Sequence, residues 1–191
     1  MPKVIAPIEV IRVLNKAKIS FVLVGAYGLA GWKDEARGTE DVDVVVAAKH
    51  LKKAVKTLLE AFPHLEPVDL PVVVRLRERA TQDVVIDVMK PLQQPYIEVF
   101  KHTHSVTSEG QTYRVPSLEM ALVMKFAAMT SIYRADEDKF RDAHDFIRMV
   151  KANSNIDETI MARLASLVYE DAGKEIQEMV RKIRAGEKLI L

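Results

Sequence analysis

Apolar residues recur in two different patterns along the first 115 residues. Short runs of β-branched residues are typical of strands, and longer stretches repeat apolar residues at the three- and four-residue spacing of a helix. The first 115 residues also include a segment at 106–115, which is either a hairpin or an irregular bridge. The pattern predicts strands at 21–24, 41–46, 72–76 and 84–89, with helices at 8–17, 26–32 and 49–62. These elements predict a four-stranded mixed sheet flanked by helices.

The pattern changes after Pro116, where nearly all of the remaining sequence is compatible with helix and poor in strand signals. Ser117 is suited to cap a helix that begins at Leu118. Breaks divide this region into four predicted helices, and they lie at residues 134–137, 153–157 and 171–173. We therefore expect an α+β fold, with a mixed-sheet domain over residues 1–115 and a C-terminal helical lobe over residues 116–191.

Composition narrows the choice of chemistry. The net charge is +1, from 28 basic and 27 acidic residues, so no global field attracts nucleic acid or an anionic membrane. The absence of cysteine excludes disulfides, thiolate nucleophiles and zinc–thiolate sites. There is no apolar run of membrane-spanning length and no secretory signal pattern at the start. We expect a cytoplasmic protein with oxygen ligands for any metal.

Three carboxylates lie in predicted strands. Asp41 and Asp43 alternate with valine, so they project to the same side of their strand. A divalent cation would remove their mutual repulsion, since Mg²⁺ prefers carboxylate oxygens and substrate phosphates. Asp87 lies in an otherwise apolar run and needs a partner if it is buried. If the two strands are neighbours, the three carboxylates can hold two cations roughly 3.5–4 Å apart.

Residues that precede the aspartate pair are suited to phosphate binding. Gly25 ends the first strand at a turn into a helix, where the backbone N–H groups of Gly25 and Ala26 can receive phosphate oxygens. Arg37 and Thr39 offer a guanidinium and a hydroxyl close to the same position. The alternative for Arg37 is a surface salt bridge, and for Thr39 it is a preference for a strand edge.

This set of residues resembles the nucleotidyltransferase superfamily. The sequence is similar to its minimal, toxin-like branch in bacteria and archaea, which includes abortive-infection type nucleotidyltransferases. The resemblance covers about residues 20–150. The residues that carry it are Gly25-Ala26, the run Arg37-x-Thr39-x-Asp41-x-Asp43, and Asp87.

The resemblance implies a nucleotidyltransferase-type mixed sheet flanked by helices. It also implies that Asp41 and Asp43 are metal ligands, with Asp87 as the third ligand and a possible base. The expected cofactor is Mg²⁺ in a two-metal site, with Mn²⁺ as an alternative. Many members place Gly-Ser or Gly-Gly at the turn, whereas this chain has Gly25-Ala26. A serine contact to phosphate is therefore absent, and backbone donors must suffice.

The family pattern continues into the helical lobe, with an apolar helix at 118–129 followed by an acidic-basic helix at 139–145. Lys125 lies on the apolar face of the first helix, so it either extends from a buried stripe or contacts nucleotide phosphates. We expect a contact with the triphosphate. Asp142 and Asp145 either belong to a solvated face with internal ion pairs or brace Lys125 or Arg37.

Two functional hypotheses follow. In the first, the protein is an enzyme that transfers a nucleoside monophosphate from a nucleoside triphosphate to a hydroxyl acceptor and releases pyrophosphate. An RNA 3′ end or a protein is the favoured acceptor, and a small molecule is the third candidate. In the second, the fold serves as a non-catalytic interaction module, such as one component of a toxin–antitoxin pair with a partner protein. Ala26 is the best support for the second hypothesis.

Overall fold

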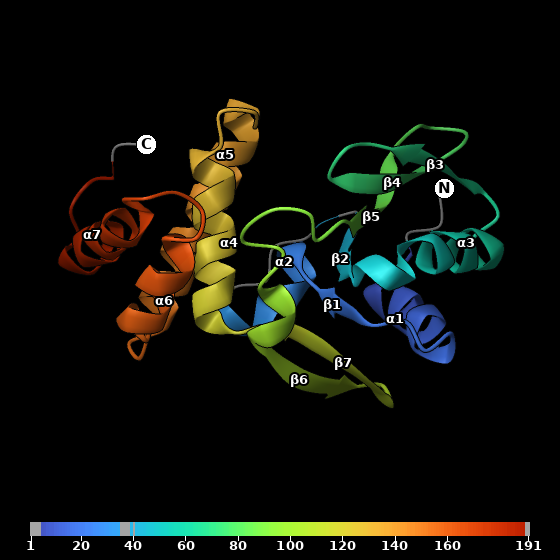
Figure 1. The fold of residues 1–191 in the computed structure, drawn as a ribbon, viewed down its shortest axis with the longest axis horizontal. Coiled ribbons are helices and arrows are strands. Elements are labelled where there is room, and N and C mark those ends of the chain that lie inside the picture. The colour runs from blue at the N-terminus through green and yellow to red at the C-terminus, as the bar shows by residue number, and fades with distance from the viewer. Residues whose placement is uncertain (1–4, 35–38, 40, 190–191) are drawn as a thin grey trace. The chain divides into compact units, whose positions relative to one another are not determined.

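The computed structural model of the protein describes residues 5–34, 39 and 41–189, and Figure 1 shows its helices and strands. These residues form two compact units. The first contains residues 5–30, 39 and 41–116, and the second contains residues 31–34 and 117–189. The first unit holds a mixed sheet and the second is helical, which confirms the predicted α+β class. The division into a nucleotidyltransferase-like domain at 1–115 and a helical lobe at 116–191 stays a prediction.

The first unit is built on a five-stranded sheet in the order β1-β2-β5-β4-β3. Strands β2 and β5 are parallel, whereas every other pair of neighbours is antiparallel. The sheet is therefore mixed and mostly antiparallel. Its strands are β1 (Phe21–Leu23), β2 (Val42–Val46), β3 (Leu65–Asp69), β4 (Val73–Glu78) and β5 (Val84–Met89).

Strand β3 is the element that the apolar pattern does not predict, so the sheet has five strands and not four. Pro67 in its centre lacks an N–H group, and Glu66 and Asp69 interrupt the apolar run. β3 lies at the edge of the sheet and pairs only with β4. Proline is tolerated in an edge strand, because one side of that strand has no ladder to complete.

Helices α1 (Pro7–Lys16) and α3 (Leu51–Ala61) cover one face of the sheet (Figure 1). Val44 of β2 and Val88 of β5 point into this core and have no exposed surface. Both helices have an apolar face toward the sheet, because their apolar residues recur at helical spacing. The side chains that alternate with these valines therefore point to the opposite face of the sheet.

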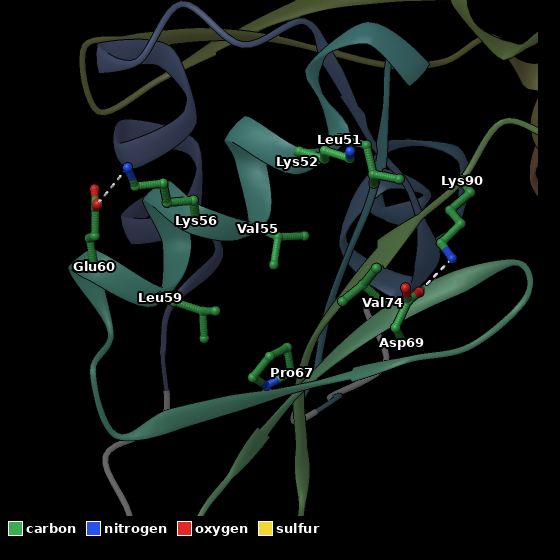
Figure 2. A pocket seen from close by; sticks show the side chains of 10 residues that line it. All are labelled: Leu51, Lys52, Val55, Lys56, Leu59, Glu60, Pro67, Asp69, Val74 and Lys90. Atoms are coloured by element: carbon green, nitrogen blue, oxygen red, sulfur yellow. Dashed lines mark hydrogen bonds and ion pairs between the residues drawn. The ribbon is translucent and has the colours of Figure 1, made fainter.

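An apolar hollow of about 660 Å³ opens on the helix-covered face, between α3 and strands β3 and β4 (Figure 2). Val55 and Leu59 of α3 line it together with Pro67 of β3. Two lysines at its rim are paired with neighbouring carboxylates, Lys56 with Glu60 at 3.8 Å and Lys90 with Asp69 at 2.5 Å. The hollow is thus on the other side of the sheet from Asp43 and Asp87.

Two shorter features complete the first unit. Helix α2 (Gly25–Gly28) follows β1 directly. Strands β6 (Thr103–Ser108) and β7 (Gln111–Pro116) pair as an antiparallel hairpin, so the segment at 106–115 belongs to a hairpin and not to an irregular bridge. Glu109 and Gly110 both have positive φ angles, +46° and +71°, as in the two-residue turns that match the twist of a hairpin.

The second unit contains the predicted helices. Ser117 caps the first of them, since the Met120 N–H donates to its hydroxyl at 3.3 Å. Within the described part of the chain, none of the helices combines the length and the apolar character that a membrane span requires. The helices are α4 (Leu118–Thr130), α5 (Asp136–Ala152), α6 (Glu158–Ala165) and α7 (Ala172–Ala185).

Helices α4 and α5 are joined by a buried ion cluster. The ammonium of Lys125 lies 2.7 Å from Asp142 Oδ1 and 2.8 Å from Asp145 Oδ2. Lys33 pairs with the other oxygen of Asp145 at 2.8 Å, and Arg134 pairs with Asp142 at 2.5 Å. Burial alone would raise the pKa of Asp145, but Lys125 and Lys33 outweigh it and hold that pKa below its ordinary value. Asp145 is therefore ionised in the folded protein at neutral pH.

At neutral pH the free energy of unfolding of Lys33→Met should be about 1.5–3 kcal/mol lower than that of wild type. This is the contribution expected of a hydrogen bond to a charged group, about 1.5–3 kcal/mol. Because the pKa of Asp145 is lowered, this carboxylate stabilises the fold above about pH 4 and loses that effect as the pH falls through its native pKa. In the Lys33→Met variant the pKa of Asp145 is lowered less than in wild type, because one of its two cations is missing. The difference between wild type and variant should therefore narrow as the pH falls below about 4.

Denaturant unfolding between about pH 7 and pH 3 measures this difference. The control is Asp34→Asn, which changes an exposed ion pair with Arg148 and should alter stability by less than about 1 kcal/mol. A difference between Lys33→Met and wild type that stays constant over the whole pH range would contradict the assignment.

Helix α2 packs so closely on β1 that Gly28 has no room for a side chain. A Cβ at this position would lie 2.2 Å from the carbonyl oxygen of Leu23, so the backbone must move in Gly28→Ala. We expect the free energy of unfolding to fall by about 1–3 kcal/mol. Gly31→Ala is the matched control, because no atom of the described residues lies within 4 Å of its added Cβ. Thermal unfolding of both variants by circular dichroism tests the difference.

Candidate functional site

Parallel pairing of β2 and β5 sets two carboxylates side by side. Asp43 lies directly opposite Asp87 in the register of these strands, and both point to the face that α1 and α3 do not cover. Asp41 comes immediately before β2. One carboxylate oxygen from each of the three residues lies within 4.8 Å of the other two. The structure thus brings the three predicted carboxylates together.

Asp41 is held by the residues that precede it. The hydroxyl of Thr39 donates a hydrogen bond to Asp41 Oδ1, and the hydroxyl of Tyr27 donates to the carbonyl oxygen of Thr39 at 3.0 Å. The Thr39 hydroxyl, predicted from the sequence as a nucleotide contact, is therefore directed at a carboxylate. Its contact with a nucleotide stays a prediction.

Because Gly25 has no side chain, the carboxylate of Asp43 occupies the position that a Cβ at residue 25 would take. A Cβ at Gly25 would lie 1.8 Å from Asp43 Oδ2, and the backbone has a φ of +59°, which strongly favours glycine. The Val24 N–H donates to the carbonyl oxygen of Asp43 at 2.9 Å. The next residue, Ala26, is 5% exposed and has no side-chain hydrogen-bond donor to offer a ligand. Gly25 is therefore needed beside the carboxylate cluster.

Asp87 is the least satisfied of the three carboxylates. Its side chain is 14% exposed, and among the described residues its buried Oδ1 has no hydrogen-bond partner. The nearest cation is Arg75, with Nε 3.4 Å from Oδ1. Burial raises the pKa of Asp87, Arg75 opposes that shift, and the negative charge of Asp41 adds to it. The net direction is a pKa above the ordinary value.

These observations fit a divalent cation. Oxygen ligands on three converging carboxylates are what Mg²⁺ and Mn²⁺ prefer. A cation would bind Asp87 Oδ1, whose contact with a cation is otherwise a 3.4 Å ion pair with Arg75, and would remove the repulsion among the three carboxylates. Asp41, Asp43 and Asp87 are therefore the residues that could hold a metal.

Two further residues, Arg37 and Lys125, were predicted as nucleotide contacts. Arg37 falls outside the described residues. Lys125 belongs to the second unit, where Asp142 and Asp145 both bind its ammonium. These two aspartates are 3% and 1% exposed, so they brace Lys125 and do not form a solvated helix face. A contact between Lys125 and nucleotide phosphates stays a prediction.

Two arginines near the site were missed from the sequence. Arg75 is paired with Asp87 across β4 and β5, and Arg77 is close enough to influence the pKa of Asp87. The signal was present in the alternation of β4, where Val74 and Leu76 point into the core and arginine occupies positions 75 and 77. The predicted strand at 72–76 ended one residue before Arg77.

Three solved structures share the fold of this chain. An antigenic nucleotidyltransferase-like protein from Paracoccidioides brasiliensis is 20% identical with a TM-score of 0.54, over 94% of this chain and 90% of that one. The antibiotic-resistance factor ANT(2″)-Ia, solved in solution, is 9% identical with a TM-score of 0.56, over 93% and 90%. The lincosamide antibiotic adenylyltransferase LnuA, in its lincomycin-bound form, is 15% identical with a TM-score of 0.50, over 77% and 99%. At these identities the likeness shows a common fold.

Family membership comes from the sequence. A comparison with curated proteins finds no match. The family model described as "Nucleotidyl transferase AbiEii toxin, Type IV TA system" matches residues 12–189. This range contains the three carboxylates, the Gly25 turn and the buried ion cluster, and it supports nucleotidyl transfer as the class of reaction. The chain therefore belongs to the AbiEii nucleotidyl transferase toxin family of type IV toxin–antitoxin systems, which confirms the predicted toxin-like branch.

Proposed function

We propose that the protein transfers a nucleoside monophosphate from a nucleoside triphosphate to a hydroxyl acceptor and releases pyrophosphate. The acceptor oxygen forms a bond to the α-phosphorus, while the bond between that phosphorus and the oxygen bridging to the β-phosphate breaks. The proton of the acceptor hydroxyl passes to a base or to water. Atoms and charge then balance without any further reactant.

One observation supports this proposal above the others. Asp41, Asp43 and Asp87 have carboxylate oxygens within 4.8 Å of one another, beside a glycine turn, in a chain of a nucleotidyl transferase family. A cluster of three carboxylates with a buried, unsatisfied oxygen is costly to keep unless it binds a cation. Retention of this cluster is expected of an active enzyme.

The three carboxylates would hold Mg²⁺, or Mn²⁺, in a two-metal site, and the bound ions would stabilise charge on the attacking and leaving oxygens. Asp87 would orient the acceptor hydroxyl or accept its proton. Burial raises the pKa of Asp87 above its ordinary value, which makes its ionised form a stronger base.

The remaining contacts in the proposal are with the triphosphate. Backbone N–H groups of Gly25 and Ala26 would receive phosphate oxygens, and because α2 spans only four residues they would act as single donors more than through a helix dipole. Arg37 would add a guanidinium. Lys125 would use its third N–H, because two are directed at Asp142 and Asp145.

The acceptor we favour is an RNA 3′ end or a hydroxyl of a protein, since a toxin acts by disabling a component of its host cell. We place the reaction in the cytoplasm, where nucleoside triphosphates and Mg²⁺ are available. The toxin–antitoxin context of the family also suggests a partner protein. A small-molecule acceptor, such as an aminoglycoside, is a further outcome that the test below distinguishes.

Asp87→Asn should make the protein more stable without divalent cations, because it removes a buried charge whose pKa is raised. Added Mg²⁺ or Mn²⁺ at about 100-fold its dissociation constant should stabilise the wild type by roughly 2.7 kcal/mol and the variant much less. Denaturant unfolding with and without each cation measures both effects. Asp83→Asn, an exposed position before β5, is the control. Equal cation stabilisation of Asp87→Asn and wild type would argue against the metal site.

Incubation with each nucleoside triphosphate, labelled at the α-phosphate, and Mg²⁺ should transfer label to one acceptor class. Total RNA, total protein and an aminoglycoside are offered in separate reactions. Label at the γ-phosphate should not be transferred, because it leaves with pyrophosphate. Asp43→Asn should reduce transfer by about 100-fold or more.

Two results would contradict the proposal. Transfer that persists in Asp43→Asn would exclude the carboxylate cluster as its origin. Absence of transfer, together with no cation-dependent stabilisation by any nucleoside triphosphate, would favour the non-catalytic interaction module.

A further inference from the structure

Strand β4 carries two arginines on the face of the sheet that holds the carboxylates. Arg75 lies opposite Asp87 in the register, with Nε 3.4 Å from Asp87 Oδ1 and 40% of the side chain exposed. Arg77 follows two residues later, so its side chain leaves the strand on the same face. Its charge also lowers the pKa of Asp87. The two arginines form a strip along β4.

The strip contains a guanidinium donor that no described residue binds. The buried Nε of Arg77 has no hydrogen-bond partner among the described residues, whereas the Nε of Arg75 is ion-paired with Asp87 Oδ1. Glu66 lies opposite Arg77 on β3, and its carboxylate accepts a hydrogen bond from Gln82 at 2.9 Å. A buried donor on a charged group is costly without an acceptor. An anionic ligand would supply that acceptor.

The order of the strands gives the direction from which this ligand arrives. Across the sheet the order is β1, β2, β5 and β4, which corresponds to the Gly25 turn, the Asp41 and Asp43 pair, Asp87 and then the arginines. In the proposed function, on which this inference rests, the phosphates of the triphosphate contact the Gly25 turn. The attacking and leaving oxygens lie on opposite sides of the α-phosphorus in an in-line displacement. The acceptor therefore approaches from the side of β4.

We propose that Arg75 and Arg77 bind a phosphate group of the acceptor, in the backbone of a single nucleic-acid strand whose terminal hydroxyl lies beside Asp87. A guanidinium presents a planar fork of donors that matches phosphate oxygens. A polycationic acceptor would be repelled by the same strip. Arg75 and Arg77 are thus specificity-determining residues on the acceptor side of the site.

Binding of a defined probe tests this proposal without any catalytic step. The probe is a fluorescein-labelled single-stranded oligoribonucleotide with a free 3′ hydroxyl, and its binding to the full chain is followed by fluorescence anisotropy without nucleoside triphosphate. Arg75→Gln and Arg77→Gln should each weaken binding about tenfold, as for one lost charge-assisted hydrogen bond. Each should also reduce the slope of log K against log salt by about 0.7.

Arg79→Gln is the matched control, because Arg79 is exposed and two residues further along the chain, and it should leave affinity and salt slope within about twofold of wild type. The lysine variants Arg75→Lys and Arg77→Lys keep the charge and should retain the salt slope.

Asp87→Asn should strengthen binding in the absence of cations, because it removes a negative charge next to Arg75. A probe with neutral methylphosphonate linkages should bind wild type and both glutamine variants equally weakly.

The outcomes separate this inference from the proposed function. Loss of probe binding in Arg75→Gln and Arg77→Gln supports the strip even where no nucleotidyl transfer occurs. Probe binding by both glutamine variants that matches Arg79→Gln overturns the inference, even where transfer of α-phosphate label is intact. Transfer to protein or to an aminoglycoside that is unchanged in both variants also overturns it.

Discussion

The parallel pairing of β2 with β5 is the constraint on which the site depends, because its register sets Asp43 opposite Asp87. Two carboxylates about 4 Å apart repel each other by roughly 4 kcal/mol at an intermediate dielectric. The opposite face of the same strands offsets this cost. Val42, Val44, Ile86 and Val88 are fully buried there, and each contributes about 1.5–3 kcal/mol. The pairing is therefore stable on its apolar face and electrostatically strained on its polar face.

The buried carboxylates of the two units differ in how completely they are paired with cations. In the first unit, Asp87 keeps a buried oxygen without a hydrogen-bond partner among the described residues, so the cluster has negative charge available for a ligand. In the second unit, Asp142 and Asp145 are each contacted by two cations. The second arrangement is complete within the protein and holds helices together. In the proposed function, a bound cation would complete the first arrangement.

The parts of the fold that follow one strong pattern could be predicted from the sequence. Strand β5 and the helices after Pro116 are examples, because continuous β-branched runs and helical spacing leave few alternatives. Strand β3 could not be predicted, since Pro67 argues against a strand unless its edge position is already known. The convergence of Asp87 with the other two carboxylates required strand order, which no local pattern contains.

Charged residues with buried side chains were the hardest to interpret. Asp142 and Asp145 stand in a strongly charged helix segment, and only the tertiary positions of Lys33 and Lys125 show that the aspartates are enclosed. Arg77 was assigned to a connection because the apolar run ends at Leu76. A charge that pairs across long sequence separations has no local signature, so these roles depend on the structure.

Pro67 also limits how the molecule can associate with copies of itself. An edge strand with a regular row of free N–H and C=O groups can act as a template on which another chain adds a strand. β3 is the edge of the sheet beside β4, and Pro67 interrupts its row of donors at the centre of only five residues. This edge therefore resists the growth of an intermolecular sheet, which favours a protein that stays dispersed when it is abundant.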